Sequence, residues 1–185
     1  MIFFSADHHV AHANIIKYTN RPFADIHEMN RELVIRWNKV VGSTDTVYYL
    51  GDLTLGGLGI AMDFLSQLNG KIYILLYPYH HDKNWLAEGR QSILSSKHQR
   101  VEYCPGLHVV EVSETPFPIS LCHYPLAQWE RSHYGAIHLH AHSHGNYHAR
   151  GAIHDVGVDN NSYAPISLIQ VLQIIEKKLE AEQSD

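Results

Sequence analysis

Short apolar runs separated by polar or glycine-containing turns dominate the chain, and this pattern predicts an α/β fold. The runs predicted as strands cover residues 1–6, 46–50, 72–76, 109–112, 119–122, 136–140 and 152–158. No internal repeat, low-complexity tract or linker interrupts the pattern. We therefore expect residues 1–185 to form a single domain, a length that fits one hydrophobic core.

Segments in which apolar residues recur every three or four positions predict helices at 25–41, 60–68 and 165–182. The apolar face of the first consists of Ile26, Met29, Leu33, Trp37 and Val40. Asp25 and Glu28 fit a capped start of this helix, and Gly42 fits its end. The apolar face of the last is expected to consist of Ile169, Leu172, Ile175 and Leu179.

Aspartate and histidine side chains follow several predicted strands directly. They are Asp7, His8 and His9, then Asp52 after Gly51, then His80, His81 and Asp82, then His123, and then His140, His142 and His144. Because ligands from separate strand ends converge at the edge of an open α/β sheet, we expect the strand ends that carry these side chains to meet there. The chain has 16 histidines that are not gathered in a terminal tag, which also favours a metal site.

These ligand types define the chemistry. Imidazole and carboxylate groups without thiolates suit manganese, zinc, iron or nickel. Because one carboxylate can bridge two cations, seven or eight such groups suffice for a pair of metals. Two metals about 3.5–4 Å apart hold a bridging hydroxide and clamp both oxygens of an in-line displacement at phosphorus. The sequence therefore predicts hydrolysis of a phosphate ester, with a spare histidine to protonate the leaving group.

Composition limits the partners. The net charge of −5 argues against a protein that grips long nucleic acid through a basic surface. A small phosphorylated substrate remains compatible, because bound metals supply positive charge locally. Two cysteines, no signal-peptide pattern and no apolar run of membrane-spanning length indicate a cytoplasmic protein with reduced thiols that does not bind membranes. The sequence leaves the oligomeric state open.

Five motifs, each behind a predicted strand, together resemble the calcineurin-like metallophosphoesterase family, in particular a small bacterial and phage-type branch. They are Asp7-x-His9, Gly51-Asp52, His81-Asp82, His123 and His142-x-His144. Further similar phrases are His-Ala-Asn-Ile-Ile-Lys-Tyr at 12–18, Asn-Arg-Pro-Phe at 20–23 and His-Tyr-Pro-Leu at 123–126. The resemblance extends from Ile2 to about Ser167 and implies a metallophosphoesterase-type sandwich of two mixed β-sheets flanked by α-helices.

The resemblance also implies the role of each site residue. Asp7, His9 and His144 would bind the first metal, Asp52 would bridge, and His123 and His142 would bind the second. His81 would lie beside the scissile phosphate without binding metal, and Asp82 would orient it. The implied cofactors are two divalent transition metal ions, with manganese expected and zinc, iron or nickel as alternatives. The implied activity is that of a phosphoric ester hydrolase, acting on a diester rather than a monoester.

The third motif departs from the family pattern. The family has Gly-Asn-His followed by an acidic residue, whereas this chain has Tyr79, His80, His81 and Asp82. His80 replaces the asparagine that binds the second metal, and Tyr79 tolerates a positive φ less well than glycine. We therefore expect His80 to bind a second metal that is held more weakly than the first. The same departure favours an alternative, a non-catalytic metal-binding protein with a degenerate second site.

Several other residues allow two interpretations. Arg21 could clamp a substrate phosphate or form a surface salt bridge, and His12 is a second candidate for substrate binding. His8 is expected to point away from its ligand neighbours, and His138 and His140 to be ordinary strand residues. Tyr124 and Trp129 could line the site or belong to the core. A nuclease acting on short or single-stranded substrates is a further alternative function.

Overall fold

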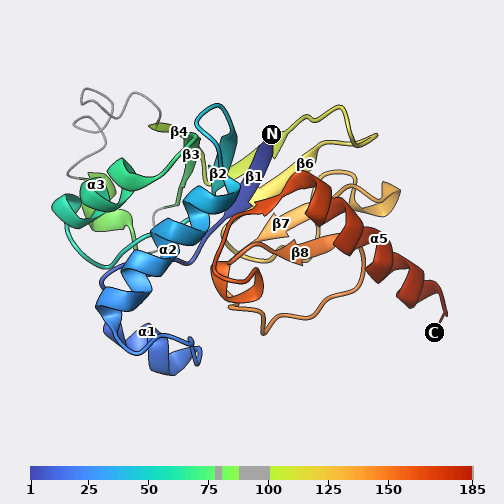
Figure 1. Cartoon of the computed structure of the whole chain (residues 1–185). Helices are drawn as coiled ribbons and strands as arrows, with labels where there is room; N and C mark the ends of the chain where they lie inside the picture. The colour runs from blue at the N-terminus through green and yellow to red at the C-terminus, as the bar shows by residue number, and fades with distance from the viewer. Residues whose placement is uncertain (78–80, 88–100, 185) are drawn as a thin grey trace.

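Two mixed β-sheets stack against each other in the computed structural model, which describes residues 1–77, 81–87 and 101–184 (Figure 1). The first sheet contains β1 (Ile2–Ser5), β2 (Thr46–Tyr49), β3 (Lys71–Leu76), β4 (Val101–Pro105) and β9 (Ile166–Ser167). The second contains β5 (Leu107–Val110), β6 (Ile119–Cys122), β7 (His138–His140) and β8 (Ile153–Asp155). The strand orders are β4-β3-β2-β1-β9 and β5-β6-β7-β8. Only β9 in the first sheet and β5 in the second run antiparallel to their neighbours among the described strands.

The helices are α1 (Ala13–Tyr18), α2 (Ile26–Val40), α3 (Leu58–Gln67) and α5 (Leu168–Ser184), with short 3-10 helices η1 (Ser132–Tyr134) and η2 (Val158–Asn160). Residues 83–87 are also helical. Figure 1 shows α1, α2 and α3 on one side of the molecule and α5 on the other. The predicted sandwich of two mixed sheets flanked by helices is therefore confirmed as an architecture.

Strand alternation divides the core into two parts. Phe3 packs with Met29, Leu33 and Trp37 of α2, outside the first sheet. Phe4, the next residue, packs between the sheets and beneath α5. Successive side chains of a strand point to opposite faces, so β1 contributes to both clusters. Each fully buried large side chain of α2 adds roughly 1.5–3 kcal/mol of hydrophobic stabilisation.

The start of α2 follows the sequence prediction closely. The Asp25 side chain accepts hydrogen bonds from the backbone N–H groups of His27 and Glu28, each at 2.8 Å. Glu28 in turn accepts one from the N–H of Ala24. These bonds satisfy N–H groups that lack partners within the helix, which is the physical reason for the capped start.

Other element predictions were incomplete. α1, β4 and β9 were not predicted, and α3 begins at Leu58 rather than at residue 60. The predicted face of the last helix was partly wrong, because Ile169 is 59% exposed while Leu168 and Val171 are buried. The two-residue strand β9 directly precedes this helix and pairs with β1.

The chain passes from the first sheet to the second at Gly106, between β4 and β5. A Cβ at this position would lie 2.5 Å from the carbonyl oxygen of Leu76. Only glycine allows so close an approach of two backbone segments. In the described residues, no helix combines the length and the apolarity needed to cross a bilayer.

Candidate metal centre

One carboxylate oxygen, Asp52 Oδ2, is the point on which three histidines converge. The Nε2 atoms of His9, His81 and His123 each lie 3.7 Å from it. The other oxygen, Oδ1, accepts a hydrogen bond of 2.9 Å from the backbone N–H of His81. Asp52 itself is only 3% exposed, so the carboxylate is fixed and largely shielded from water.

Two groups of potential ligand atoms share Asp52. The first consists of His9, Asp52 and His81, and the second of Asp52, His123 and His142, with the atoms of each group within 4.8 Å of one another. His9, Asp52 and His123 are buried, whereas His81 and His142 are exposed. The centre is therefore enclosed on one side and open to solvent on the other.

The ligands follow the carboxyl ends of parallel strands in both sheets. Asp7 and His9 follow β1, Asp52 follows β2, and His123 follows β6. Backbone hydrogen bonds continue beyond the strands, from Asp7 N to Gly51 O at 3.0 Å and from His9 N to Asp52 O at 3.1 Å. An isolated bridge between Ala6 and Gly157 joins the two sheets beside the site. The ligand loops are thus held by backbone contacts as well as by their side chains.

Five of the predicted ligands have left-handed backbone conformations. The φ values are 59° at Asp7, 51° at His9, 58° at Asp52, 67° at His142 and 48° at His144. A positive φ is uncommon for residues with a side chain and costs of order 1–3 kcal/mol at each position. Such strain persists where the surrounding structure enforces it, and it is concentrated at functional sites.

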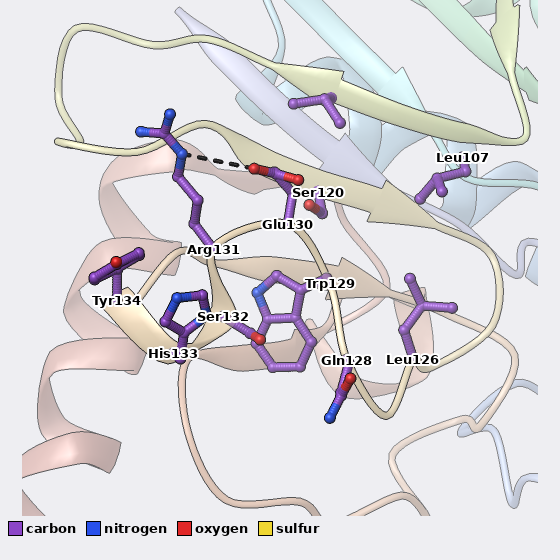
Figure 2. A pocket seen from close by; sticks show the side chains of 11 residues that line it. Leu107, Ser120, Leu126, Gln128, Trp129, Glu130, Arg131, Ser132, His133 and Tyr134 are labelled. Carbon is purple, nitrogen blue, oxygen red and sulfur yellow. Dashed lines mark ion pairs between the residues drawn. The ribbon is translucent and has the colours of Figure 1, made fainter.

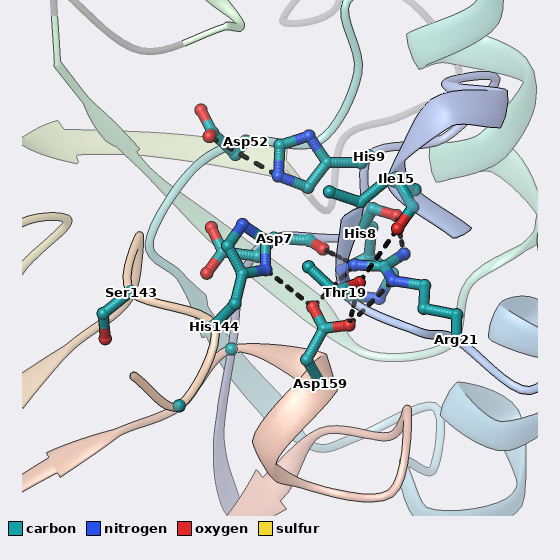
Figure 3. Close-up of polar contacts among 12 residues, drawn as sticks. Asp7, His8, His9, Ile15, Thr19, Arg21, Asp52, Ser143, His144 and Asp159 are labelled. Atoms are coloured by element: carbon teal, nitrogen blue, oxygen red, sulfur yellow. Dashed lines mark hydrogen bonds and ion pairs between the residues drawn. The ribbon is translucent and has the colours of Figure 1, made fainter. Parts of the chain in front are cut away.

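Asp7 and His144 belong to neither of these two groups, but both lie next to them. Asp7 Oδ2 accepts a hydrogen bond of 2.9 Å from the backbone N–H of His142. The ring of His144 lies 5.2 Å from that of His9, centroid to centroid. The structure therefore brings these two predicted ligands to the edge of the same centre (Figure 3).

Hydrogen bonds fix which ring nitrogen of two histidines faces the centre. His123 Nδ1 lies 3.1 Å from the carbonyl oxygen of Leu50, and His144 Nδ1 lies 2.8 Å from the Asp159 carboxylate. Both oxygens can only accept, so each Nδ1 must carry the proton and donate. The Nε2 lone pairs then face the centre, which is the tautomer that a metal ligand needs.

Several buried polar atoms indicate a cation site. Asp7 Oδ1 and both ring nitrogens of His9 make no hydrogen bond to any residue that the structure describes. Buried polar atoms are otherwise nearly always paired. Burial lowers the pKa of His9 to about 3, so its ring is neutral at pH 7 and can donate a lone pair. These residues fit a divalent metal.

Negative charge is also concentrated here. Asp7, Asp52 and Asp155 are buried, and the Asp159 side chain is 6% exposed. Burial, together with the charges of Asp52 and Asp155, raises the pKa of Asp7 well above its usual range. A bound cation would offset this repulsion, because metal ions are the largest local charges in such sites.

Asp155 and Gly157 support the site and were not identified from sequence. Asp155 Oδ2 accepts hydrogen bonds from Ser143 Oγ at 2.7 Å and from the N–H of Gly145 at 2.9 Å, which holds the loop that carries His142 and His144. A Cβ on Gly157 would lie 2.7 Å from Asp7 Oδ2, so glycine makes room for that carboxylate. Their role depends on contacts across the fold, and no local pattern marks it.

A cavity of about 890 Å³ lies apart from these ligands, at the edge of the second sheet (Figure 2). It is lined by Leu107, Val109, Ser120, Trp129 and Tyr134 among others, and no predicted ligand contributes to it. Trp129 donates a hydrogen bond of 2.7 Å to the carbonyl oxygen of Ala136 and forms one wall. The candidate functional site is therefore the group of side chains around Asp52, which lies outside this cavity.

The chain is similar in sequence to two known proteins and in structure to a third. No protein-family model matches it. It is 32% identical to the uncharacterized protein MJ1445 of Methanocaldococcus jannaschii, in an alignment that covers 95% of this chain and 92% of that protein. The chain belongs to the MJ1445 family.

Two further similarities are more distant. The Gene 66 protein of Mycobacterium phage L5 is 25% identical, over 84% of this chain and 85% of that protein. The crystal structure of AQ665 from Aquifex aeolicus, a protein of unknown function, matches with a TM-score of 0.66 and 22% identity, over 95% of this chain and 99% of that one. The latter shows that this MJ1445-family chain shares the fold of AQ665.

The third motif of this MJ1445-family chain is only partly described. His80 and Tyr79 lie outside the described residues, so the expected weaker second metal stays a prediction. His81 was expected to be a non-ligand, yet its Nε2 falls among the ligand atoms of the first group. Asp82 is buried and accepts hydrogen bonds from the N–H groups of Leu53 and Thr54, each at 3.0 Å, and from Trp85 Nε1 at 2.7 Å. These contacts make Asp82 an anchor for residues 53–54, and its orienting effect on the His81 ring stays a prediction.

The expectation that Arg21 binds substrate is wrong. Its side chain is 0% exposed, and its Nε and terminal nitrogens donate to Asp159 and to the carbonyl oxygens of Asp7 and His8. A guanidinium with its donors occupied in the interior cannot clamp a phosphate in solution. His12 remains a candidate, because its half-buried ring lies 5.8 Å from that of His9.

His8 and His138 lie outside the group of predicted ligands, whereas Tyr124 lies beside it. His8 points away from the ligands, as expected, and packs its ring against Trp37, Tyr49 and Phe64. Tyr124 flanks the site, with its ring 4.5 Å from that of His142. His138 is a structural residue, as expected.

His138 gives this MJ1445-family chain a predicted pH dependence. Its Nδ1 donates to Ser120 O at 2.9 Å, its Nε2 accepts from Leu126 N at 3.1 Å, and burial lowers its pKa from 6.5 to about 4. Because the folded-state pKa is depressed, the stability contributed by the neutral ring is full above pH 6.5 and is lost as pH falls toward 4. Chemical denaturation of metal-free protein should show this loss, with His138 adding a slope of about 1.4 kcal/mol per pH unit.

The matched variant is His138→Gln, which keeps one donor and one acceptor but does not titrate in this range. Between pH 6.5 and 4, we expect this variant to take up one proton fewer on unfolding than the wild-type protein. Its free energy of unfolding should therefore depend less steeply on pH. An unchanged slope in the variant would contradict a neutral buried His138.

Proposed function

We propose that this protein is a dinuclear metal-dependent phosphoesterase with a metallophosphoesterase-type fold. The observation that carries the proposal is the sharing of Asp52 by two groups of ligand atoms. A single-metal site needs no shared carboxylate, whereas a two-metal site uses one to hold both cations. The resemblance of the five strand-end motifs to calcineurin-like metallophosphoesterases supports the same conclusion.

The residues divide naturally between two cations. Asp7, His9 and His144 would hold the first, His123 and His142 would hold the second, and Asp52 would serve both. His80 is a predicted ligand of the second from its sequence motif alone. Two divalent metals, which we expect to be manganese, would supply Lewis acidity and a hydroxide nucleophile at neutral pH. The protein keeps His9 neutral by burial and holds the Nε2 lone pairs of His123 and His144 toward the site.

The exposed side of the centre is where a substrate would enter. The His81 side chain is 44% exposed and reaches Asp52, so its ring can give a proton to a leaving alkoxide at the mouth of the site. The half-buried His12 ring lies 5.8 Å from that of His9 and is a second candidate for contact with the substrate. Cys104 and Cys122 are both buried and free, which agrees with our proposal of a cytoplasmic location. The proposed substrate is a small phosphorylated molecule.

The test is metal content together with turnover. Protein purified without chelator and supplied with manganese should hold about two metals per chain and hydrolyse a bis-aryl phosphodiester. The Asp45→Asn variant is a suitable control, because Asp45 precedes β2 at the end opposite Asp52. Absence of metal after supplementation with manganese, zinc, iron and nickel would defeat the proposal. Two bound metals without turnover of diesters, monoesters or short single-stranded DNA would support the non-catalytic alternative.

A further inference from the structure

The Arg21 guanidinium connects two ligand-bearing parts of the chain that are far apart in sequence. Its terminal nitrogens donate to the carbonyl oxygens of Asp7 at 2.7 Å and of His8 at 2.8 Å, within the loop that follows β1. Its Nε and one terminal nitrogen donate to the two oxygens of Asp159, at 2.8 and 2.7 Å. Figure 3 shows this network reaching from the β1 loop to η2.

Asp159 also contacts His144, so the network of hydrogen bonds extends to this predicted ligand. Its Oδ2 accepts from His144 Nδ1 at 2.8 Å as well as from Arg21, and its Oδ1 accepts from Thr19 Oγ1 at 2.9 Å. The bidentate pairing with a buried guanidinium leaves the carboxylate little freedom to rotate. The His144 ring therefore has a fixed direction, with Nε2 turned away from Asp159.

We propose that Asp159 and Arg21 are positioning residues for the first metal site, acting as one unit on His144 and on the backbone of Asp7 and His8. The inference rests on the proposed function, because it assumes that Asp7, His9 and His144 bind a metal. Besides Thr19 and Met29, the described hydrogen bonds of the Arg21 and Asp159 side chains run to Asp7, His8 and His144, and none runs to His123 or His142. The pair should therefore control the first metal and leave the second unaffected.

Both the charge of Asp159 and the geometry of its pairing with Arg21 should contribute to metal affinity at the first site. A carboxylate behind a ligand histidine makes the ring a better electron donor and restricts its rotation, and loss of such a partner usually costs about 10–100-fold in metal affinity. Arg21 supplies the fixed fork that a lysine lacks, because a lysine ammonium cannot bind both Asp159 oxygens and two carbonyl oxygens in one plane. Asp159→Asn keeps the shape and removes the charge, so it isolates the electrostatic part.

The test measures manganese affinity at one site at a time, by equilibrium dialysis. His142→Ala weakens the second site, so that the tight binding that remains reports the first site. In this background we expect Asp159→Asn to lower manganese affinity by about 10–100-fold and Arg21→Lys to lower it by a similar factor. In a His144→Ala background, which weakens the first site, Asp159→Asn should leave the remaining affinity unchanged.

The matched control is Asp45→Asn, which removes another buried, ion-paired carboxylate at the opposite end of β2. It should change neither affinity. If Asp159→Asn does not fold, Arg21→Lys alone decides the question, with thermal unfolding of the metal-free protein as the measure of folding. Equal weakening of both sites would show a merely structural role and overturn the inference.

The outcomes also separate this inference from the proposed function. If the wild-type protein binds two manganese ions and Asp159→Asn changes neither, the inference fails and the two-metal site stands. If the wild-type protein binds no metal, both fail together.

Discussion

The Asp52→Asn variant is expected to lose both metals and nearly all turnover. The asparagine side chain would keep the size of the aspartate and its hydrogen bond from the His81 backbone, but it would lack the negative charge that the two proposed cations would share. Loss of any single histidine ligand affects one cation, whereas loss of this carboxylate affects both. We expect a fall of at least about 10³-fold in kcat/KM, consistent with about 4 kcal/mol of lost transition-state stabilisation.

Metal analysis and turnover of the same preparation check this expectation. Asp45→Asn again serves as the control for a general effect of removing a buried carboxylate. Near wild-type metal content and activity in Asp52→Asn would mean that Asp52 is only a turn residue after Gly51. Loss of one metal with retention of the other would assign Asp52 to a single site and remove the argument for a bridge.

With an alkyl phosphate ester as substrate, the His81→Ala variant should lower turnover by about 10²–10⁴-fold while both metals stay bound, because the missing group is a proton donor to the leaving alkoxide. The dependence on the leaving group makes the test specific. A nitrophenolate departs without protonation, so the defect should be small with a bis-nitrophenyl diester and large with an alkyl ester. The exposed His133 on η1, outside the centre, provides a His→Ala control.

The position of His81 also allows an alternative role, in which its ring binds a metal. Its Nε2 lies 3.7 Å from Asp52 Oδ2 and groups with His9, a distance compatible with sharing a metal. Loss of one metal in His81→Ala, with the same defect for every leaving group, would make His81 a ligand. In that case the acid would have to come from elsewhere, and His12, whose ring lies near that of His9, would be the next residue to test.

The sequence was sufficient where a residue's role follows from its type and its place on a strand or helix. The apolar run at residues 1–6 was correctly predicted as a strand, and the spacing of Met29, Leu33 and Trp37 identified the buried face of α2. The strand-end histidines and Asp52 were identified because few other roles suit an imidazole or carboxylate behind an apolar run. These are local properties, and the structure brings the residues together as expected.

The sequence was insufficient where the role depends on a distant partner. Asp159 was not identified from the sequence, because nothing near it in the chain reveals its contact with Arg21, 138 residues away. For the same reason Arg21 could not be distinguished from a phosphate clamp, since both roles use the same guanidinium. The strand β9, two residues long, was also missed, because its pairing with β1 joins the two ends of the chain.

The division of the ligands between the two sheets has a consequence for the lifetime of the protein. Asp7, His9 and Asp52 belong to loops of the first sheet, and His123 and His142 to loops of the second. Each bound cation would therefore act as a removable cross-link between the two halves of the sandwich. Metal supply would then set how often the halves separate, and with it how often the chain is exposed to proteases. A protein built in this way would be cleared fastest when it holds no metal.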